Sequence, residues 1–175
     1  DCDDIMNMAE GFISKLMKKT INVDVPEHLP RMTFADAMNK YGSDKPDTRF
    51  DMLIQDISEW ADNTDFVVFK SAIADGGSVK AIVAKNAASV YTRKKIDKLT
   101  ASAKGIGAKG LAYVRWADAE PNCSFYKFLK DGELDELLST LGAQQGDVVF
   151  IVSDKTGKAL TVMGALRLMV AKELD

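Results

Sequence analysis

Apolar residues recur with a helical period at the start of the chain. In residues 1–20 they lie three or four positions apart, with acidic residues early and lysines late, which predicts an amphipathic helix. Its apolar stripe consists of Ile5, Met8, Ala9, Phe12, Ile13, Leu16 and Met17. A shorter helix is predicted over residues 34–41, because Gly42 and the turn-rich segment GSDKPD follow it. Residues 51–64 show no clear period and are predicted to form a linker with one helical turn around 57–60.

The pattern changes at Phe66, from which strands and helices alternate. Short apolar or alternating runs predict strands at 66–74, 78–85, 110–116 and 147–153. Helical spacing predicts helices at 92–104, 133–141 and 155–173. This order predicts an α+β fold, β2-α-β2-α in outline, with a mostly antiparallel sheet and helices on one face. The predicted division places a helical segment and linker in residues 1–62 and the α+β domain in residues 63–175.

Composition and charge narrow the class of protein. Hydrophobic residues make up 46% of the 175 residues and charged residues 28%, as in globular chains with a buried core. No apolar run reaches the length of a membrane span, so no membrane partner is expected. The net charge of −3 argues against a protein built mainly to bind nucleic acid, and no DNA partner is expected.

The charge is nevertheless unevenly distributed. Residues 85–110 carry seven basic side chains against a single acidic one, Asp97. A local basic face on an acidic protein either contacts phosphates or is simply a solvated helix face, and the sequence leaves both interpretations open.

The six residues GIGAKG, Gly105 to Gly110, match the spacing of a dinucleotide-binding loop. Such a loop leaves a strand and opens a helix, because the phosphates bind at the helix N-terminus. In this chain the predicted helix comes first and the predicted strand second. The glycines are therefore interpreted as the C-terminal cap of a helix and not as a nucleotide site.

Other side chains with catalytic potential lack partners in the sequence. His28 is the only histidine, and Cys2 and Cys123 are far apart, so neither a zinc site nor a disulfide framework is indicated. The segment SDKTGKAL lacks the glycine-rich run of a phosphate-binding loop, and Asp154 is better interpreted as the N-cap of the last helix. The residues alone thus predict an α+β module without a metal site or an active site of its own.

Three long segments together resemble one family. They are PRMTFADAMNKYGSDKPDTRF, GGSVKAIVAKNAASVYTRKKIDKLTASAKGIGAKGLAYVRW, and GDVVFIVSDK with GALRLMVAKEL. In order and spacing they are similar to bacterial-type aspartyl-tRNA synthetase. The resemblance implies that residues 63–175 form the GAD insertion domain and that residues 1–62 derive from the class II catalytic domain that the insert interrupts. It also implies a cytoplasmic, homodimeric parent that charges tRNA with aspartate, using ATP and Mg²⁺.

The resemblance further implies which parts are missing. The family's motifs that bind ATP and aspartate have no counterpart here, so the chain is expected to be a piece of the enzyme, inactive alone, without catalytic residues or a cofactor. An alternative of a different class is a stand-alone α+β module that binds RNA or a protein without catalysis.

Two groups of residues match the family and are candidates for a role. The candidates for supporting the active site or the tRNA acceptor end, or for only fixing the junction of the insert, are Asp44, Lys45, Asp47 and Arg49. The candidates for contact with the tRNA backbone are Arg93, Lys94, Lys95 and Lys98; the alternative is that the insert is only a structural spacer.

Overall fold

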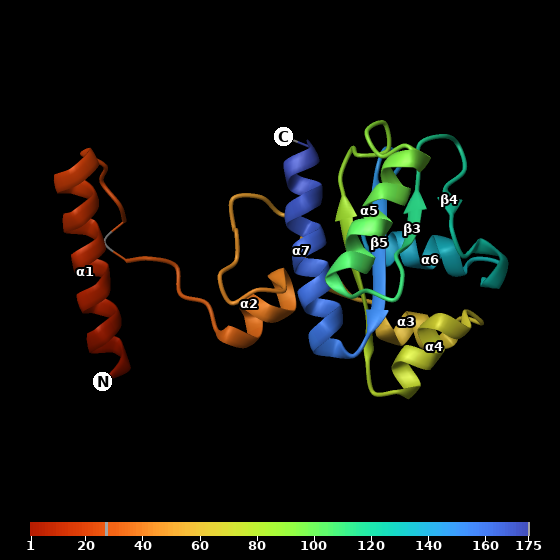
Figure 1. Ribbon diagram of the computed structural model, residues 1–175, viewed down its shortest axis with the longest axis horizontal. Coiled ribbons are helices and arrows are strands. Elements are labelled where there is room, and N and C mark those ends of the chain that lie inside the picture. The colour runs from red at the N-terminus through yellow and green to blue at the C-terminus, as the bar shows by residue number, and fades with distance from the viewer. Residues whose placement is uncertain (27, 175) are drawn as a thin grey trace. The chain divides into compact units, whose positions relative to one another are not determined.

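The computed structural model describes residues 1–26 and 28–174 and divides the chain into two compact units, Asp1–Thr33 and Phe34–Asp175. The first unit contains the helix α1 (Cys2–Ile21) and the segment that follows it (Figure 1). Asp1 begins α1 with a capping box, and Asn22 ends it in the left-handed conformation, with φ 53°. The predicted amphipathic helix is confirmed, and the apolar side chains of Ile5, Met8 and Phe12 on its stripe are exposed.

The second unit is built around a five-stranded sheet with the order β1-β2-β5-β3-β4, in which every pair of neighbours is antiparallel. Its elements, in chain order, are α2 (Phe34–Tyr41), β1 (Gln55–Asp56), α3 (Ser58–Asn63), α4 (Val67–Ala74), β2 (Ser78–Ala84), α5 (Arg93–Ile106), β3 (Ala112–Arg115), β4 (Asn122–Cys123), η1 (Tyr126–Phe128), α6 (Glu133–Thr140), β5 (Val148–Asp154) and α7 (Thr156–Leu174). The central strands β2 and β5 pair along their whole length, from Ser78 opposite Asp154 to Ala84 opposite Val148.

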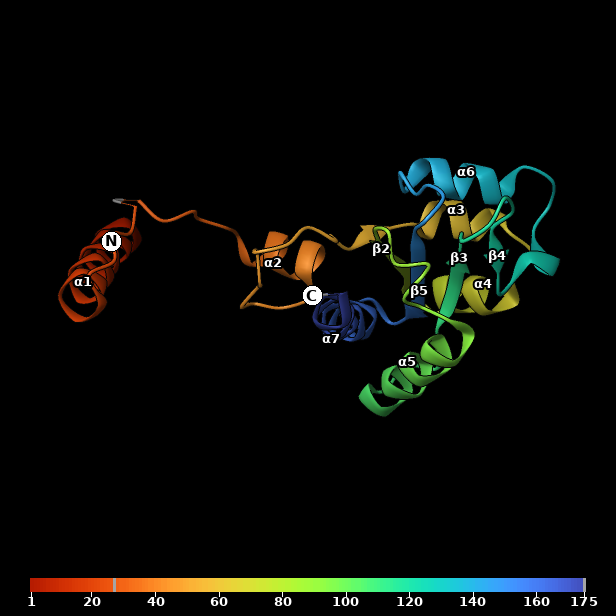
Figure 2. The same ribbon diagram turned by 90° about the horizontal axis from the view of Figure 1, so that it is seen from above.

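Helices cover both faces of this sheet. Alternate residues of β5 point to opposite sides: Phe150 belongs to the core beneath α5 and α7, whereas Ile151 belongs to the core beneath α3, α4 and α6. Figure 2 shows the two layers of helices on either side of the strands. The α+β class and the antiparallel sheet are confirmed, but the helices do not lie on one face as predicted. The sequence of β5, VVFIVSD, already carries the near-continuous apolar run of a strand that is buried on both faces.

The predicted strand at 66–74 is wrong, because this segment forms the helix α4. Its β-branched and aromatic residues favour a strand locally. However, Phe69 and Ala72, three positions apart, are buried against the sheet, whereas Val67 and Val68 are exposed. This spacing is helical, and tertiary packing overrides the local preference.

The strand next to β2 comes instead from the segment predicted to be a linker. Gln55 and Asp56 form β1 and pair with Ala81 and Lys80, and α3 follows where one helical turn was predicted. The remaining predicted strands and helices agree with β2, β3, β5, α5, α6 and α7.

Close backbone contact joins α2 to α7. A Cβ atom on Gly42 would lie 2.2 Å from the carbonyl oxygen of Leu160, and one on Gly164 would lie 2.7 Å from that of Tyr41. Gly42 also has φ +69°, a conformation that side chains disfavour. Glycine is therefore required at both positions for α2 to approach α7.

Candidate nucleic-acid interface and its supporting loop

The helix α5 presents the basic side chains that the sequence singled out. Ile96, Leu99 and Ala103 are buried against the sheet and α7. This inward face leaves four exposed basic residues in the first half of the helix: Arg93, Lys94, Lys95 and Lys98. Gly107 ends α5 in the left-handed conformation, with φ 108°, which confirms that GIGAKG closes a helix.

The four basic side chains of α5 differ in their partners. Lys95 forms an ion pair with Glu173 of α7, and Arg93 lies 3.6 Å from Asp97 one turn along the helix. Within the described part of the chain, Lys94 and Lys98 have no ion-pair partner. Lys98 is close enough to Glu173, together with Lys95, to hold the pKa of that carboxyl below its ordinary value, with the hydrogen bond from Lys95 as the main cause. Lys94 and Lys98 are therefore the cations most available to an anionic partner.

A groove lies beside Lys95 and Lys98, between α5 and α7. The groove is lined by Tyr91, by the apolar side chains of Leu99 and Met169, and by the polar side chains of Lys95, Lys98, Ser102 and Glu173. Two of the basic side chains of α5, Lys95 and Lys98, thus border a concave surface.

The loop after α2 carries the second candidate group. Asp47 accepts hydrogen bonds from Nε and Nη2 of Arg49, at 2.9 and 2.6 Å, and from the backbone N–H of Arg49. The hydrogen bonds from Arg49 lower the pKa of Asp47 to about 2. Lys45 pairs with Asp44 at 3.1 Å, and the side chains of Lys45 and Arg49 are both 87% exposed.

Arg167 of α7 holds this loop, and the sequence reasoning did not single it out. Its guanidinium group donates hydrogen bonds to the backbone carbonyls of Asp47, Phe50, Asp51 and Met52, at 2.7 to 3.1 Å. It also lies against two aromatic rings, 4.8 Å from the centroid of Tyr41 and 4.0 Å from that of Phe50. Burial lowers the pKa of Arg167, and nearby Tyr41, Asp47 and Asp51 oppose that shift. An arginine in the middle of the apolar run GALRLMV was the available signal, since an unpaired charge is rarely buried there.

The structure does not bring the two candidate groups together. In Figure 1, α7 lies between α2 and α5. The loop contacts one side of α7 through Arg167, and α5 contacts it through the Lys95–Glu173 pair. The helix α7 is thus the common support of both groups.

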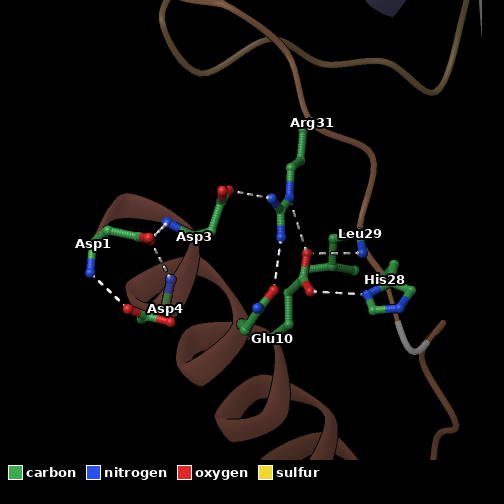
Figure 3. Close-up of polar contacts among 8 residues, drawn as sticks. Asp1, Asp3, Asp4, Glu10, His28, Leu29 and Arg31 are labelled. Atoms are coloured by element: carbon green, nitrogen blue, oxygen red, sulfur yellow. Dashed lines mark hydrogen bonds and ion pairs between the residues drawn. The ribbon is translucent and has the colours of Figure 1, made fainter.

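Among the described residues, the remaining reactive side chains form no catalytic arrangement. His28 lies in the first unit, where its Nδ1 is 3.3 Å from the carboxylate of Glu10 (Figure 3). Glu10 also accepts the backbone N–H of Leu29 and lies 3.7 Å from Arg31, so this cluster fastens the segment 28–31 to α1. Contact with His28 is the main reason why the pKa of Glu10 is lowered.

Among the described residues, neither a nucleophilic cysteine nor a metal-binding cluster provides a further candidate site. Burial raises the pKa of Cys123 to about 11, which disfavours the thiolate that a nucleophile requires. Among residues 1–26 and 28–174, no cluster of three or more histidine, cysteine, aspartate or glutamate side chains is placed to hold a metal ion. No helix in these ranges is both long and apolar enough to cross a membrane.

The fold and these surfaces define an α+β module of a known class. Residues 69–163 match the GAD domain, and the chain belongs to this family.

Sequence similarity to known proteins extends beyond the residues that match the GAD domain. The chain is 45% identical over 175 residues to an aspartate–tRNA ligase of Staphylococcus saprophyticus. It is 43% identical over 174 residues to the aspartate–tRNA ligase of Staphylococcus carnosus, and 47% identical over 173 residues to an aspartate–tRNA(Asp/Asn) ligase of Bacillus mycoides. These matches cover 99% to 100% of the chain but only 29% to 30% of each relative. The chain therefore spans less than a third of the length of the curated relatives it matches.

Proposed function

We propose that the chain is the GAD-containing segment of an aspartate–tRNA ligase, and that α5 contacts the backbone of the tRNA. The observation that carries the proposal is the similarity of about 45% over the whole chain to enzymes with this name, on both sides of the GAD match. In this proposal the complete protein charges tRNA with aspartate in the cytoplasm, as a homodimer that uses ATP and Mg²⁺.

The contact with tRNA is supported by the charges of α5. Lys94 and Lys98 lie one helical turn apart on an exposed face and have no ion-pair partner in the described ranges. Two unpaired cations at this spacing attract the phosphate backbone irrespective of its sequence. Lys95 and Arg93 are engaged within the protein and contribute less.

The loop residues have a different proposed role. We infer that Asp44, Lys45, Asp47 and Arg49 support the active site or the tRNA acceptor end in the complete enzyme. The exposure of Lys45 and Arg49 and the ordered Asp47–Arg49 pair support this role.

Binding of aspartate-specific tRNA to this chain, measured by fluorescence anisotropy from low to physiological salt, tests the contact with α5. We expect saturable binding, and we expect each of Lys94→Ala and Lys98→Ala to reduce the slope of log K against log salt by roughly one unit. Lys172→Ala is the matched control, because it removes an exposed lysine from the last turn of α7. Equal slopes for all four proteins would remove α5 from the proposed interface.

A second experiment tests the proposed division of labour. We expect no aspartate-dependent exchange between ATP and pyrophosphate with this chain alone, and exchange with the complete ligase that contains it. Exchange by the chain alone would contradict the proposal.

A further inference from the structure

The arrangement around Arg167 is unusual, because a charged side chain is buried and donates its hydrogen bonds to the backbone of a single loop. Arg167 is 1% exposed, and its four hydrogen bonds all go to backbone carbonyls of residues 47–52. Burying a cation away from water is costly unless its donors are satisfied. A guanidinium group has five N–H donors in a rigid plane, so it can serve four carbonyls at once, whereas the ammonium group of lysine has only three donors.

The hydrogen bonds and the ring contacts act on the same short segment. Phe50 supplies a carbonyl to Nη2 of Arg167 and also places its ring 4.0 Å from the guanidinium carbon. Tyr41, at the other end of the loop, supplies the second ring. The contact between Gly42 and Gly164 brings the start of the loop onto α7 at the same place. The backbone from residue 41 to residue 52 is therefore attached to α7 at both ends.

The side chains of this loop are treated in the opposite way. Lys45 and Arg49 project into solvent, where Lys45 pairs with Asp44 and Arg49 pairs with Asp47. A fixed backbone that carries exposed charged side chains is the arrangement expected of a preorganised binding or supporting element, since the cost of ordering it is met before a partner arrives.

We propose that Arg167 is a positioning residue for the reaction of the complete ligase: from α7 it fixes the loop Tyr41–Met52, and with it the Asp47–Arg49 pair. This inference rests on the proposed function. It means that the last helix of the second unit, through a side chain that is itself buried, sets the geometry of a loop that precedes the GAD match in sequence.

The test compares Arg167→Lys, Arg167→Met and Phe50→Leu with the control Lys172→Met in the complete ligase. Phe50→Leu is the mildest variant, because it keeps all four hydrogen bonds and removes one ring. Amide hydrogen exchange is measured for residues 43–53, with α5 and β5 as internal references, together with kcat and KM for aspartylation.

We expect both Arg167 variants to raise exchange in residues 43–53 by about tenfold or more at labelling times at which α5 and β5 are still protected, because the loop loses its contacts. We expect kcat to fall by about tenfold with the KM for ATP within about twofold, since Arg167 contacts no substrate. Phe50→Leu should show smaller changes in the same direction, and Lys172→Met should show none.

Three results would overturn the proposal in distinguishable ways. Unchanged loop exchange in both Arg167→Lys and Arg167→Met would show that Arg167 does not hold the loop. Raised exchange with unchanged kcat would show that the reaction does not depend on the order of the loop. A wild-type protein that charges no tRNA would remove the proposed function and the catalytic role together, while the exchange data would still decide whether Arg167 holds the loop.

Discussion

The loop Tyr41–Met52 and the helix α5 both present basic side chains, but they are built in opposite ways. Residues 42–52 have no regular secondary structure, and a buried arginine on α7 holds the backbone of the loop. The helix satisfies its own backbone, and only its inward apolar face depends on the rest of the unit. The comparison shows that similar charges can be carried by a backbone that depends on one distant side chain or by a helix that forms its own backbone hydrogen bonds. Substitutions should affect the stability of these two regions differently.

The largest effect is expected for Arg167→Met. The substitution leaves four carbonyls without their donor and removes two ring contacts. Because the loop can turn some of these carbonyls toward water, we expect the free energy of unfolding of the second unit to fall by about 3 kcal/mol. Urea denaturation followed by tryptophan fluorescence measures it, since Trp60 and Trp116 both lie in this unit. A loss below about 1 kcal/mol would contradict the view that the loop depends on Arg167.

A smaller loss in the free energy of unfolding is expected for Gly164→Ala, which disturbs the contact between α7 and the start of the same loop. The new Cβ would lie 2.7 Å from the carbonyl oxygen of Tyr41 and 2.8 Å from that of Gly42. Overpacking of this kind costs about 1–3 kcal/mol. The matched control is Gly157→Ala in the same helix, where no atom lies within 4 Å and stability should stay unchanged or rise. Equal midpoints for the two variants in urea would show that α2 does not need close contact with α7.

The pH dependence of stability should report the Asp47–Arg49 pair of the loop. The pKa of Asp47 is about 2 in the folded protein against an ordinary value of 3.8, so its ionised form favours the folded state. This stabilisation is complete above the ordinary pKa and is lost as the pH falls from about 4 toward 2. Asp47→Asn should therefore lower the urea midpoint at pH 6 and converge with the wild type near pH 2. A constant difference across that range would assign the effect to packing and not to charge.

The smallest effect on stability is expected for Lys94→Ala with Lys98→Ala. Both side chains are exposed, and neither has an ion-pair partner in the described ranges, so the free energy of unfolding should change by less than about 0.5 kcal/mol. The same pair should alter the salt dependence of tRNA binding. A loss of stability above about 1 kcal/mol would make these lysines part of the fold and would weaken the contrast with the loop.

Sequence patterns predicted the parts of the fold that rest on local periodicity. The helices α5 and α7 and the strands β2 and β5 follow from apolar spacing because each contributes a long regular face to the core, whereas α1 follows from the period of an apolar stripe that is exposed. The segment 66–74 was misassigned because Val67 and Val68 favour a strand locally, while the burial of Phe69 and Ala72 is decided by distant residues. The helices on the second face of the sheet were not predicted, for a related reason. The side chains of β5 that point to the two faces are both apolar, so the sequence of β5 shows no alternation of apolar and polar residues.

The candidate sites show the same division. The basic residues of α5 could be identified from the sequence, because a helix places charged and apolar residues on predictable faces. The role of Arg167 could not, because its partners are backbone carbonyls more than a hundred positions away. Main-chain acceptors have no signature in the sequence, and only the folded arrangement identifies them.

The coverage of both faces of the sheet has a consequence for how this domain can distinguish one RNA from another. Modules that read the letters of single-stranded RNA display aromatic rings on an open sheet and stack bases upon them. Here Phe69, Phe125 and Phe150 are at most 1% exposed and face helices, not solvent. A nucleic acid that meets this sheet finds both of its faces covered by helices in place of such a stacking surface. Any selection among tRNAs that the domain contributes would then depend on their three-dimensional outline, and the reading of nucleotide identity would fall to other parts of a synthetase.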